Sequence, residues 1–235
     1  MEVGDGDRKQ LMSGTIDRVD ICENGTDVYV RIIDYKTGKK DFNIVKTYYG
    51  IDIQLMVYME AAMKLVAKMR PGKNVIPAGV FYYNISDPIV SATTESAEEI
   101  EDKIKGELRL KGMVNSDKDI AEKMDNTEGT SLNIPVSRKA DGGFDSRRSK
   151  VMNTEQFNIL GRFVDVRAID TADRIAGGDI KRSPYKDGQF SSCDRCPYGA
   201  VCGFSVDLPG CNYRKLKKFC LLYTSDAADD RISVD

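Results

Sequence analysis

Two short extended segments joined by a tight turn most constrain how this chain can fold. Residues 12–22 and 28–37 are rich in β-branched residues, and Asn24-Gly25 between them is typical of a two-residue β-hairpin turn. Side chains alternate across a strand. Val30 and Ile32 in the second segment therefore share one face. The sequence predicts an antiparallel hairpin with one buried face.

That buried face ends in a charged pair. Asp34 and Lys36 continue the row of Val30 and Ile32 toward the end of the second strand. Taken alone, the pair is most simply read as a solvated ion pair at a strand end, because most exposed charge pairs contribute little. A functional reading requires further polar residues directed at the same place.

The expected register supplies a second carboxylate. A symmetric turn centred on Asn24-Gly25 pairs Ile32 with Asp17 and Asp34 with Thr15. Asp17 and Asp34 then lie on one face as diagonal neighbours, about 7–8 Å apart at the backbone. Carboxylates at this separation can converge on one cation, with Mg–O distances of about 2.0–2.1 Å.

A helix expected over residues 44–69 adds an amide and a phenol. Its apolar stripe consists of Ile51, Leu55, Tyr58, Ala62, Leu65 and Met69. Gln54 lies on the inward side, four residues before Tyr58, so the two side chains reach the same region. A buried amide needs a polar partner. Together with Asp17, Asp34 and Lys36, these residues predict a Mg²⁺-assisted hydrolytic centre.

The remaining pattern alternates strands with helices. A strand is expected over residues 75–85 and a helix from Ser96 onward. The polar stretch 111–150 carries a short helix near 119–124. A long helix follows over 153–179, capped by Asn153 or Thr154 and ended by Gly177-Gly178. The order of the elements predicts an α/β fold in which a mixed sheet is flanked by helices.

Composition excludes several classes of function. The 235 residues include no histidine, which excludes Ser-His and Cys-His catalysis and histidine-ligated metals. The net charge of -2 provides no global attraction to nucleic acid, so phosphate contacts must be local. No apolar run is long enough to cross a membrane, and the first residues do not resemble a signal peptide. We therefore expect a cytoplasmic protein.

Five of the six cysteines lie in the last fifth of the chain. Cys193, Cys196 and Cys202 have the spacing C-x2-C-x5-C, a strong signal for metal binding. Zinc with Cys211 as the fourth ligand and an iron–sulfur cluster both suit these ligands, and ligand softness does not separate the two.

Several motifs together resemble the RecB-type PD-(D/E)XK nucleases. The segments are "GTIDRVD", "IIDYKTG" and "QLMVY". The resemblance implies a Mg²⁺ site formed by Asp17 and Asp34, a catalytic Lys36, and Gln54 and Tyr58 of the Q-x-x-x-Y motif. It also implies the PD-(D/E)XK core fold. The family's first motif, on a helix before the hairpin, has no counterpart here, and we therefore expect an N-terminally truncated domain.

Residues 10–218 are similar to the nuclease region of the AddB family, the B subunits of ATP-dependent helicase/deoxyribonucleases. The matching segments are "PAGVFYYNISDP", "LRLKGMVNSD", "GDIKRSPYK" and "CDRCPYGAVCGF". The resemblance implies DNA as substrate, an AddA-like partner subunit in bacteria and a role in double-strand break repair. It also implies a 4Fe-4S cluster on Cys193, Cys196 and Cys202, whose fourth cysteine lies outside this chain.

We therefore expect a nuclease core over residues 1–190, a cysteine segment over 191–218 and a tail over 220–235. "CLLYTSDAAD" in the tail resembles a translated sequencing adapter, which predicts a non-native end. One alternative is a stand-alone iron–sulfur exonuclease of the CRISPR-adaptation type. The other is a non-cutting DNA-binding module held together by zinc or iron–sulfur.

Other candidates are weaker. "KTGKK" (36–40) and "SRRSK" (146–150) are candidate phosphate contacts, although charged runs are more often simply solvated. Tyr82 and Tyr83 are candidates for base stacking, but one of an alternating pair is more often a core residue. Asp20 lies on the strand face opposite Asp17 and is expected to be structural.

Overall fold

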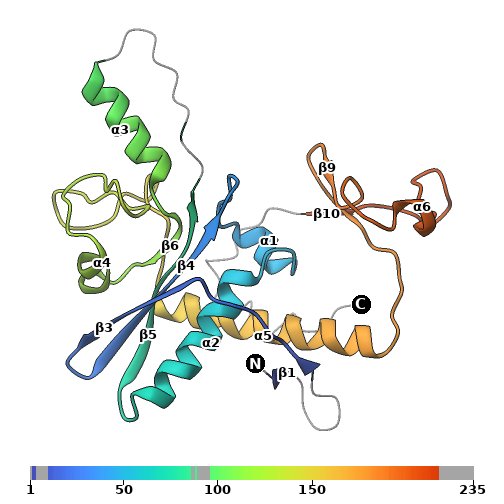
Figure 1. Ribbon diagram of the computed structural model, residues 1–235, viewed down its shortest axis with the longest axis horizontal. Helices are drawn as coiled ribbons and strands as arrows, with labels where there is room; N and C mark the ends of the chain where they lie inside the picture. Colours follow the sequence, from blue (N-terminus) through green and yellow to red (C-terminus); the bar gives the residue numbers. More distant parts are fainter. Residues whose placement is uncertain (1, 4–9, 86–87, 89–95, 217–235) are drawn as a thin grey trace.

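The computed structural model describes residues 2–3, 10–85, 88 and 96–216 (Figure 1). The tail that is expected to be non-native lies outside the described residues. Within the described part of the chain, no helix is both long and apolar enough to cross a membrane.

A mixed sheet of five strands forms the centre of the fold (Figure 1). Its strands stand in the order β3 (Arg18–Asn24), β4 (Asp27–Lys36), β5 (Asn74–Asn84), β6 (Lys111–Asn115) and β7 (Val151–Met152). The pairs β3–β4 and β5–β6 are antiparallel, whereas β4–β5 and β6–β7 are parallel. The predicted α/β class with a mixed sheet is therefore confirmed.

The β3–β4 hairpin forms, but its turn lies one residue later than expected. Asn24 pairs with Asp27, so the turn is centred on Gly25 and Thr26. Gly25 has a φ of 61°, a conformation that glycine adopts without the penalty paid by other residues.

The shifted turn changes which residues of β3 and β4 face each other. Ile32 pairs with Val19, so the expected pairings of Ile32 with Asp17 and of Asp34 with Thr15 are wrong. Because the register moves by two residues, every side chain keeps its expected face. The ladder ends at the pair of Arg18 with Ile33, so Asp17 lies just beyond it, next to the end of β4.

The single helix expected over 44–69 is two helices. Asn43 caps the start of α1 (Ile44–Tyr48), and α2 (Gln54–Met69) follows after a turn. Gly50 in that turn has a φ of 71°, which no helix accommodates. The break makes Gln54 the first residue of α2 instead of an interior one.

The buried stripe of α2 also differs from the expected stripe. Leu55 and Ala62 are buried as expected, but Leu65 and Met69 are more than half exposed. Met59 and Val66 are buried on α2 in their place. The break before α2 changes the rotation of the helix from the one that a continuous helix predicts.

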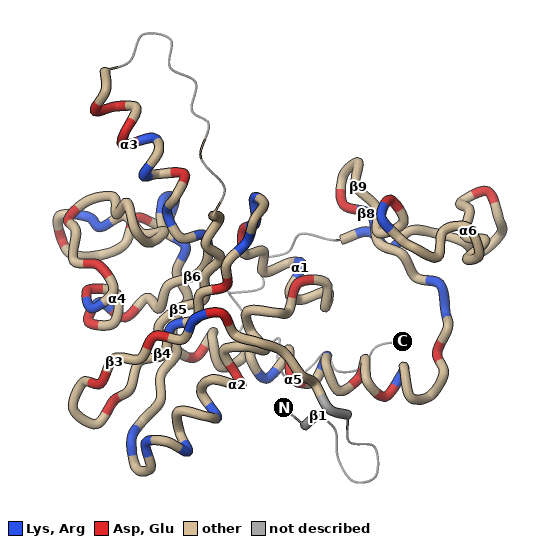
Figure 2. The backbone as a smooth tube through the Cα atoms, in the orientation of Figure 1, with Lys and Arg blue, Asp and Glu red and all other residues tan. Residues whose placement is uncertain are grey.

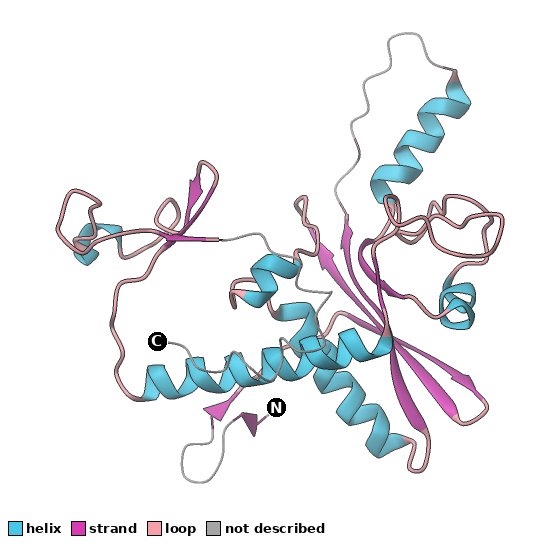
Figure 3. Cartoon of the chain, turned by 180° about the vertical axis from the view of Figure 1, so that it is seen from behind, coloured by secondary structure: helices cyan, strands magenta, loops and turns pink. Residues whose placement is uncertain are grey.

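Long helices cover one face of the sheet, and the segment between β6 and β7, which contains a short helix, covers the other (Figures 1 and 3). On the first face, α2 and α5 (Thr154–Ala176) pack against β4 and β5 around Ile32, Val80 and Phe157. On the second face, Phe81 packs beneath Ile134. The core therefore lies in two layers, one on each side of the sheet.

The helices of the second half begin where the sequence places them. Ser96 forms a capping box with Glu99 at the start of α3 (Ala97–Leu108). Asn153 does the same with Gln156 at the start of α5, and Gly177 follows its end. The short helix expected near 119–124 is α4 (Lys118–Met124). These caps satisfy amide groups that a helix start leaves without partners.

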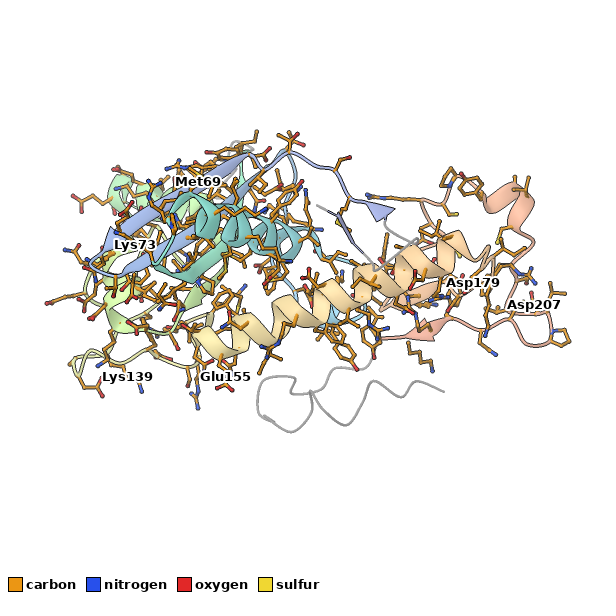
Figure 4. All side chains as sticks on the ribbon, turned by 90° about the horizontal axis from the view of Figure 1, so that it is seen from below. Met69, Lys73, Lys139, Glu155, Asp179 and Asp207 are labelled. Carbon is orange, nitrogen blue, oxygen red and sulfur yellow. The ribbon has the colours of Figure 1, made fainter. Side chains whose placement is uncertain are left out.

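The cysteine-containing segment forms a small unit of its own beyond α5. Its sheet has the order β10-β8-β9, from Arg214–Lys215, Tyr185–Asp187 and Phe190–Ser191, and α6 (Gly199–Cys202) lies between β9 and β10. Figure 4 shows α5 running from Glu155 toward Asp179, with Asp207 in this unit beyond its end. A short pair, β1 (Glu2–Val3) and β2 (Gln10–Leu11), is also present.

The small unit contacts the core through α1. Lys46 lies 3.4 Å from the carboxylate of Asp187. The guanidinium of Arg214 lies over the ring of Tyr49 at 5.9 Å. On its other side, Tyr48 stacks on Phe163 of α5 with centroids 5.0 Å apart. α1 is therefore held between α5 and the small unit.

Candidate active site

A buried carboxylate stands at the end of β4. The Asp34 residue is 2% exposed, and its neighbour along the face, Lys36, places its ammonium 2.6 Å from Asp34 Oδ2. This contact lacks hydrogen-bond geometry, and Oδ2 accepts no hydrogen bond among the described residues. A buried carboxylate oxygen in this state retains capacity to bind a further cation or donor.

The first residue of α2 closes this pair into a network. Gln54 Nε2 donates to Asp34 Oδ1 at 3.1 Å, and Gln54 Oε1 accepts from Lys36 Nζ at 3.0 Å. Gln54 Nε2 also lies 3.1 Å from the hydroxyl of Tyr58. The structure thus brings Asp34, Lys36, Gln54 and Tyr58 together. The partly buried Gln54 amide thus has polar partners on both its oxygen and its nitrogen.

Asp17 lies at the edge of this network. Its Oδ2 accepts the backbone N–H of Tyr35 at 2.8 Å, the residue between Asp34 and Lys36. Its side chain is exposed and has no described hydrogen bond to Gln54 or Tyr58. The carboxylate is therefore fixed to the backbone of β4 by one oxygen.

The glycine of the "GTID" segment lies against Tyr58. A Cβ at Gly14 would sit 3.3 Å from Tyr58 Cε1, closer than most such contacts. The absence of a side chain at Gly14 lets the segment that carries Asp17 approach the helix that carries Tyr58. This contact links the backbone of one motif to the Tyr58 ring of the other.

A second set of polar groups adjoins the network. The ring of Tyr82, buried in β5, lies beneath Lys36 and Lys40, each ammonium 5.5 Å from its centroid. The Tyr82 hydroxyl donates to Asp52 Oδ1 at 2.9 Å, and Lys40 Nζ lies 2.9 Å from Asp52 Oδ2. Burial raises the pKa of the Tyr82 hydroxyl above its ordinary value, and the charge of Asp52 raises it further, so the group is a donor at neutral pH.

The sequence did not point to Asp52. On a continuous helix over 44–69 it is an interior residue beside Gln54, whereas in the structure it belongs to the turn between α1 and α2. The turn directs it toward Tyr82 and Lys40. Gly50 was the one signal in the sequence that could have indicated the break.

The three cysteines with metal-ligand spacing are free thiols in the small unit. Cys196 is exposed, whereas Cys193 and Cys202 are partly buried. Over the described ranges, no three cysteine, aspartate or glutamate side chains are grouped closely enough to hold a metal ion. The cysteines are thus near one another in sequence but not assembled as a ligand set.

Known proteins similar to this chain match it over the residues that form the site. A family model described as the PD-(D/E)XK nuclease superfamily matches residues 1–203. Relatives named as B subunits of ATP-dependent helicase/deoxyribonucleases are similar to the chain. The one from Caldanaerobacter subterraneus subsp. tengcongensis is 38% identical over 94% of this chain and 19% of its own length.

Two clostridial proteins carry the same name. The one from Clostridium botulinum is 38% identical over 92% of this chain, and the one from Clostridium tetani is 36% identical over 99%. In each case the match covers 19% of the relative. The chain therefore spans about a fifth of the length of these relatives.

Proposed function

The chain belongs to the PD-(D/E)XK nuclease superfamily, and we propose that it is the nuclease domain of an AddB-like helicase–nuclease subunit. Its reaction is Mg²⁺-dependent hydrolysis of DNA phosphodiester bonds, as an exonuclease acting in double-strand break repair by homologous recombination. The observation that carries the proposal is the closed network of Asp34, Lys36 and Gln54 at the end of a buried strand. The word deoxyribonuclease in the names of the relatives favours DNA as the substrate.

The donors present suit Mg²⁺. Among the described residues, buried Asp34 Oδ2 accepts no hydrogen bond and contacts only the Lys36 ammonium, and oxygen is the ligand atom that Mg²⁺ prefers. Mg²⁺ is commonly held by one or two carboxylates together with waters and substrate phosphates, so a larger acidic cluster is not required. In this proposal Asp34 and Asp17 hold the ion. When bound, Mg²⁺ polarises a phosphoryl oxygen and lowers the pKa of coordinated water.

The other residues of the network orient the reacting groups or stabilise charge. Lys36 carries a positive charge beside Asp34, where it can hold the attacking water or balance charge that develops on the phosphate. Gln54 bridges Asp34 and Lys36 and fixes the distance between them. The Tyr58 hydroxyl accepts a second hydrogen bond from the Gln54 side-chain nitrogen. Gln54 and Tyr58 thus act as positioning residues for the charged pair.

A metal titration tests the proposed function. We expect the 235-residue chain to degrade linear DNA in Mg²⁺ and to stop when EDTA is added. Asp17→Asn removes one proposed ligand and should raise the Mg²⁺ concentration for half-maximal cleavage by about tenfold or more. Asp20→Asn is the matched control, since Asp20 is held by Arg18 and Arg31 and has no role in the proposed centre.

Two results would contradict this proposal. A well-folded chain that leaves linear DNA uncut at every Mg²⁺ concentration is not a nuclease. An Asp17→Asn variant with the Mg²⁺ requirement of Asp20→Asn removes Asp17 from the metal site.

We further propose that Cys193, Cys196 and Cys202 hold a 4Fe-4S cluster, with zinc as the rival occupant. Free thiols at C-x2-C-x5-C spacing and the similarity to AddB proteins support the cluster. In the structure the three cysteines do not form a ligand set. Binding therefore requires the segment from 193 to 202 to close around the cluster. The group is assigned a structural role, and no step of DNA hydrolysis passes through it.

Metal analysis separates the two occupants. We expect chain purified without oxygen to carry iron and acid-labile sulfide, with the brown absorbance of an iron–sulfur protein. Cys196→Ser should lose most of the iron, whereas Cys22→Ser, an exposed cysteine in β3, should retain it. Stoichiometric zinc with no iron in the wild-type chain would show the cluster assignment to be wrong.

The relatives are named as one subunit of a larger enzyme. We propose an AddA-like motor subunit and DNA as the partners of the complete protein. Co-purification with such a subunit tests the first partner.

A further inference from the structure

Lys40 is held in place more firmly than its position in a loop suggests. Its backbone N–H donates to Asn84 Oδ1 at 3.0 Å, and its carbonyl accepts from Asn84 Nδ2 at 3.3 Å. Asn84 is the last residue of β5, so the loop after β4 is attached to the end of the neighbouring strand. A lysine on a backbone fixed in this way presents its ammonium within a limited region.

The only ion-pair partner described for Lys40 is Asp52, and the two differ in exposure. The Lys40 side chain is 41% exposed, whereas that of Asp52 is 9% exposed. Asp52 also accepts the hydroxyl of Tyr82, so it keeps one hydrogen bond if Lys40 moves away. Releasing the lysine therefore leaves the Asp52 carboxylate with one neutral hydrogen-bond donor but no described cation, a cost that the phosphate contact must exceed.

Charge elsewhere on the molecule gives DNA little general attraction. Figure 2 shows acidic and basic residues interspersed along α3 and α5. The net charge is -2. Lys36 is engaged by Asp34 and Gln54. A phosphate beside the proposed centre therefore needs a further cation, and Lys40 is placed over the same ring as Lys36.

We propose that Lys40 binds a DNA phosphate beside the scissile bond, and that Asp52 holds its ammonium in that phosphate's place when DNA is absent. The inference rests on the proposed function, since it assumes DNA at this site. It assigns to Lys40 a binding role separate from the chemistry of Lys36. It makes Asp52 a competitor of the substrate and Tyr82 the group that keeps Asp52 in place.

Binding measured against salt tests the role of Lys40. An oligonucleotide is titrated with the 235-residue chain in EDTA, which prevents metal-dependent cleavage, over a series of KCl concentrations. Lys40→Met should lower the slope of log affinity against log salt by about one, so that a tenfold dilution of salt gains roughly eightfold less affinity. Lys40→Arg should restore the slope. Lys39→Met is the control, because that side chain is 88% exposed.

The competitor role of Asp52 predicts a change of opposite sign. Asp52→Asn keeps an acceptor for Tyr82 but no longer attracts Lys40, so DNA should bind about two- to fivefold more tightly. Asp170→Asn, an exposed position on α5, controls for the added unit of net charge. The double variant with Lys40→Met should lose the gain, because the gain acts through Lys40.

The outcomes separate this inference from the proposed function. If the wild-type chain binds and cuts DNA but Lys40→Met has the slope of Lys39→Met, the role of Lys40 is wrong and the nuclease assignment stands. If Asp52→Asn weakens binding, Asp52 is a structural partner and not a competitor. If the wild-type chain neither binds nor cuts DNA, both proposals fail.

Discussion

Lys36→Met should reduce the rate of DNA cleavage in saturating Mg²⁺ by about a thousandfold or more. The ammonium of Lys36 lies 2.6 Å from Asp34 Oδ2 and 3.0 Å from Gln54 Oε1, and no other cation among the described residues has an ion pair or hydrogen bond with Asp34 or Gln54. Methionine fills a similar volume without charge. The loss should appear in the single-turnover rate, which reports the chemical step separately from DNA binding.

Lys39→Met is a matched control for this substitution. It removes the same group three residues away, where the only described contact is a 3.7 Å approach to Glu107. It should cut DNA at close to the wild-type rate. Thermal unfolding of both variants, with and without Mg²⁺, guards against a trivial loss of fold, since Lys36→Met leaves the buried Asp34 carboxylate without its cation. Full cleavage by folded Lys36→Met would remove this lysine from the mechanism.

Gly112→Ala should destabilise the fold by about 3 kcal/mol. A Cβ at this position would lie 1.9 Å from the carbonyl oxygen of Val80 and 2.8 Å from Phe81 Cα, both in the neighbouring strand β5. Backbone atoms of a central strand cannot move aside as the end of a flexible side chain can. The methyl group must therefore push β6 away from β5, and this would disrupt the sheet on both faces.

Gly106→Ala is the matched control for that change. Gly106 lies within α3, and a Cβ there meets no atom within 4 Å. Alanine is favoured over glycine in a helix interior, so this variant should be more stable by about 0.5–1 kcal/mol. Chemical denaturation of both variants gives the two free energies of unfolding. Equal stabilities would contradict the close contact between β5 and β6.

The strand alternation and the helix spacing made the centre of the site predictable. Asp34 and Lys36 follow from the alternation in β4, and Gln54 and Tyr58 from their spacing of four. The register error did not affect the faces of the residues within β3, because a shift of two residues preserves the alternation. Asp17 itself lies one residue before β3, where the strand alternation no longer applies.

Other parts of the fold and of the site could not be predicted, because they depend on contacts between residues far apart in the sequence. β6 and β7 are five and two residues long, and neither has a pattern that distinguishes it from a loop. Glycine at position 112 suggests a turn until the carbonyl of Val80 is seen beside it. The contact of Asp52 with Tyr82 joins residues 30 apart. Only the break between α1 and α2 brings that pair together.

That break has a consequence for how the site responds to heat. A five-residue helix has no independent stability in water, so α1 depends on tertiary contacts such as Tyr48 on Phe163 and the buried Thr47 hydroxyl on the carbonyl of Asp52. α1 is followed directly by the turn that positions Gln54 at the start of α2. We therefore expect that, as the temperature rises, fraying of this short helix displaces Gln54 before the central sheet unfolds.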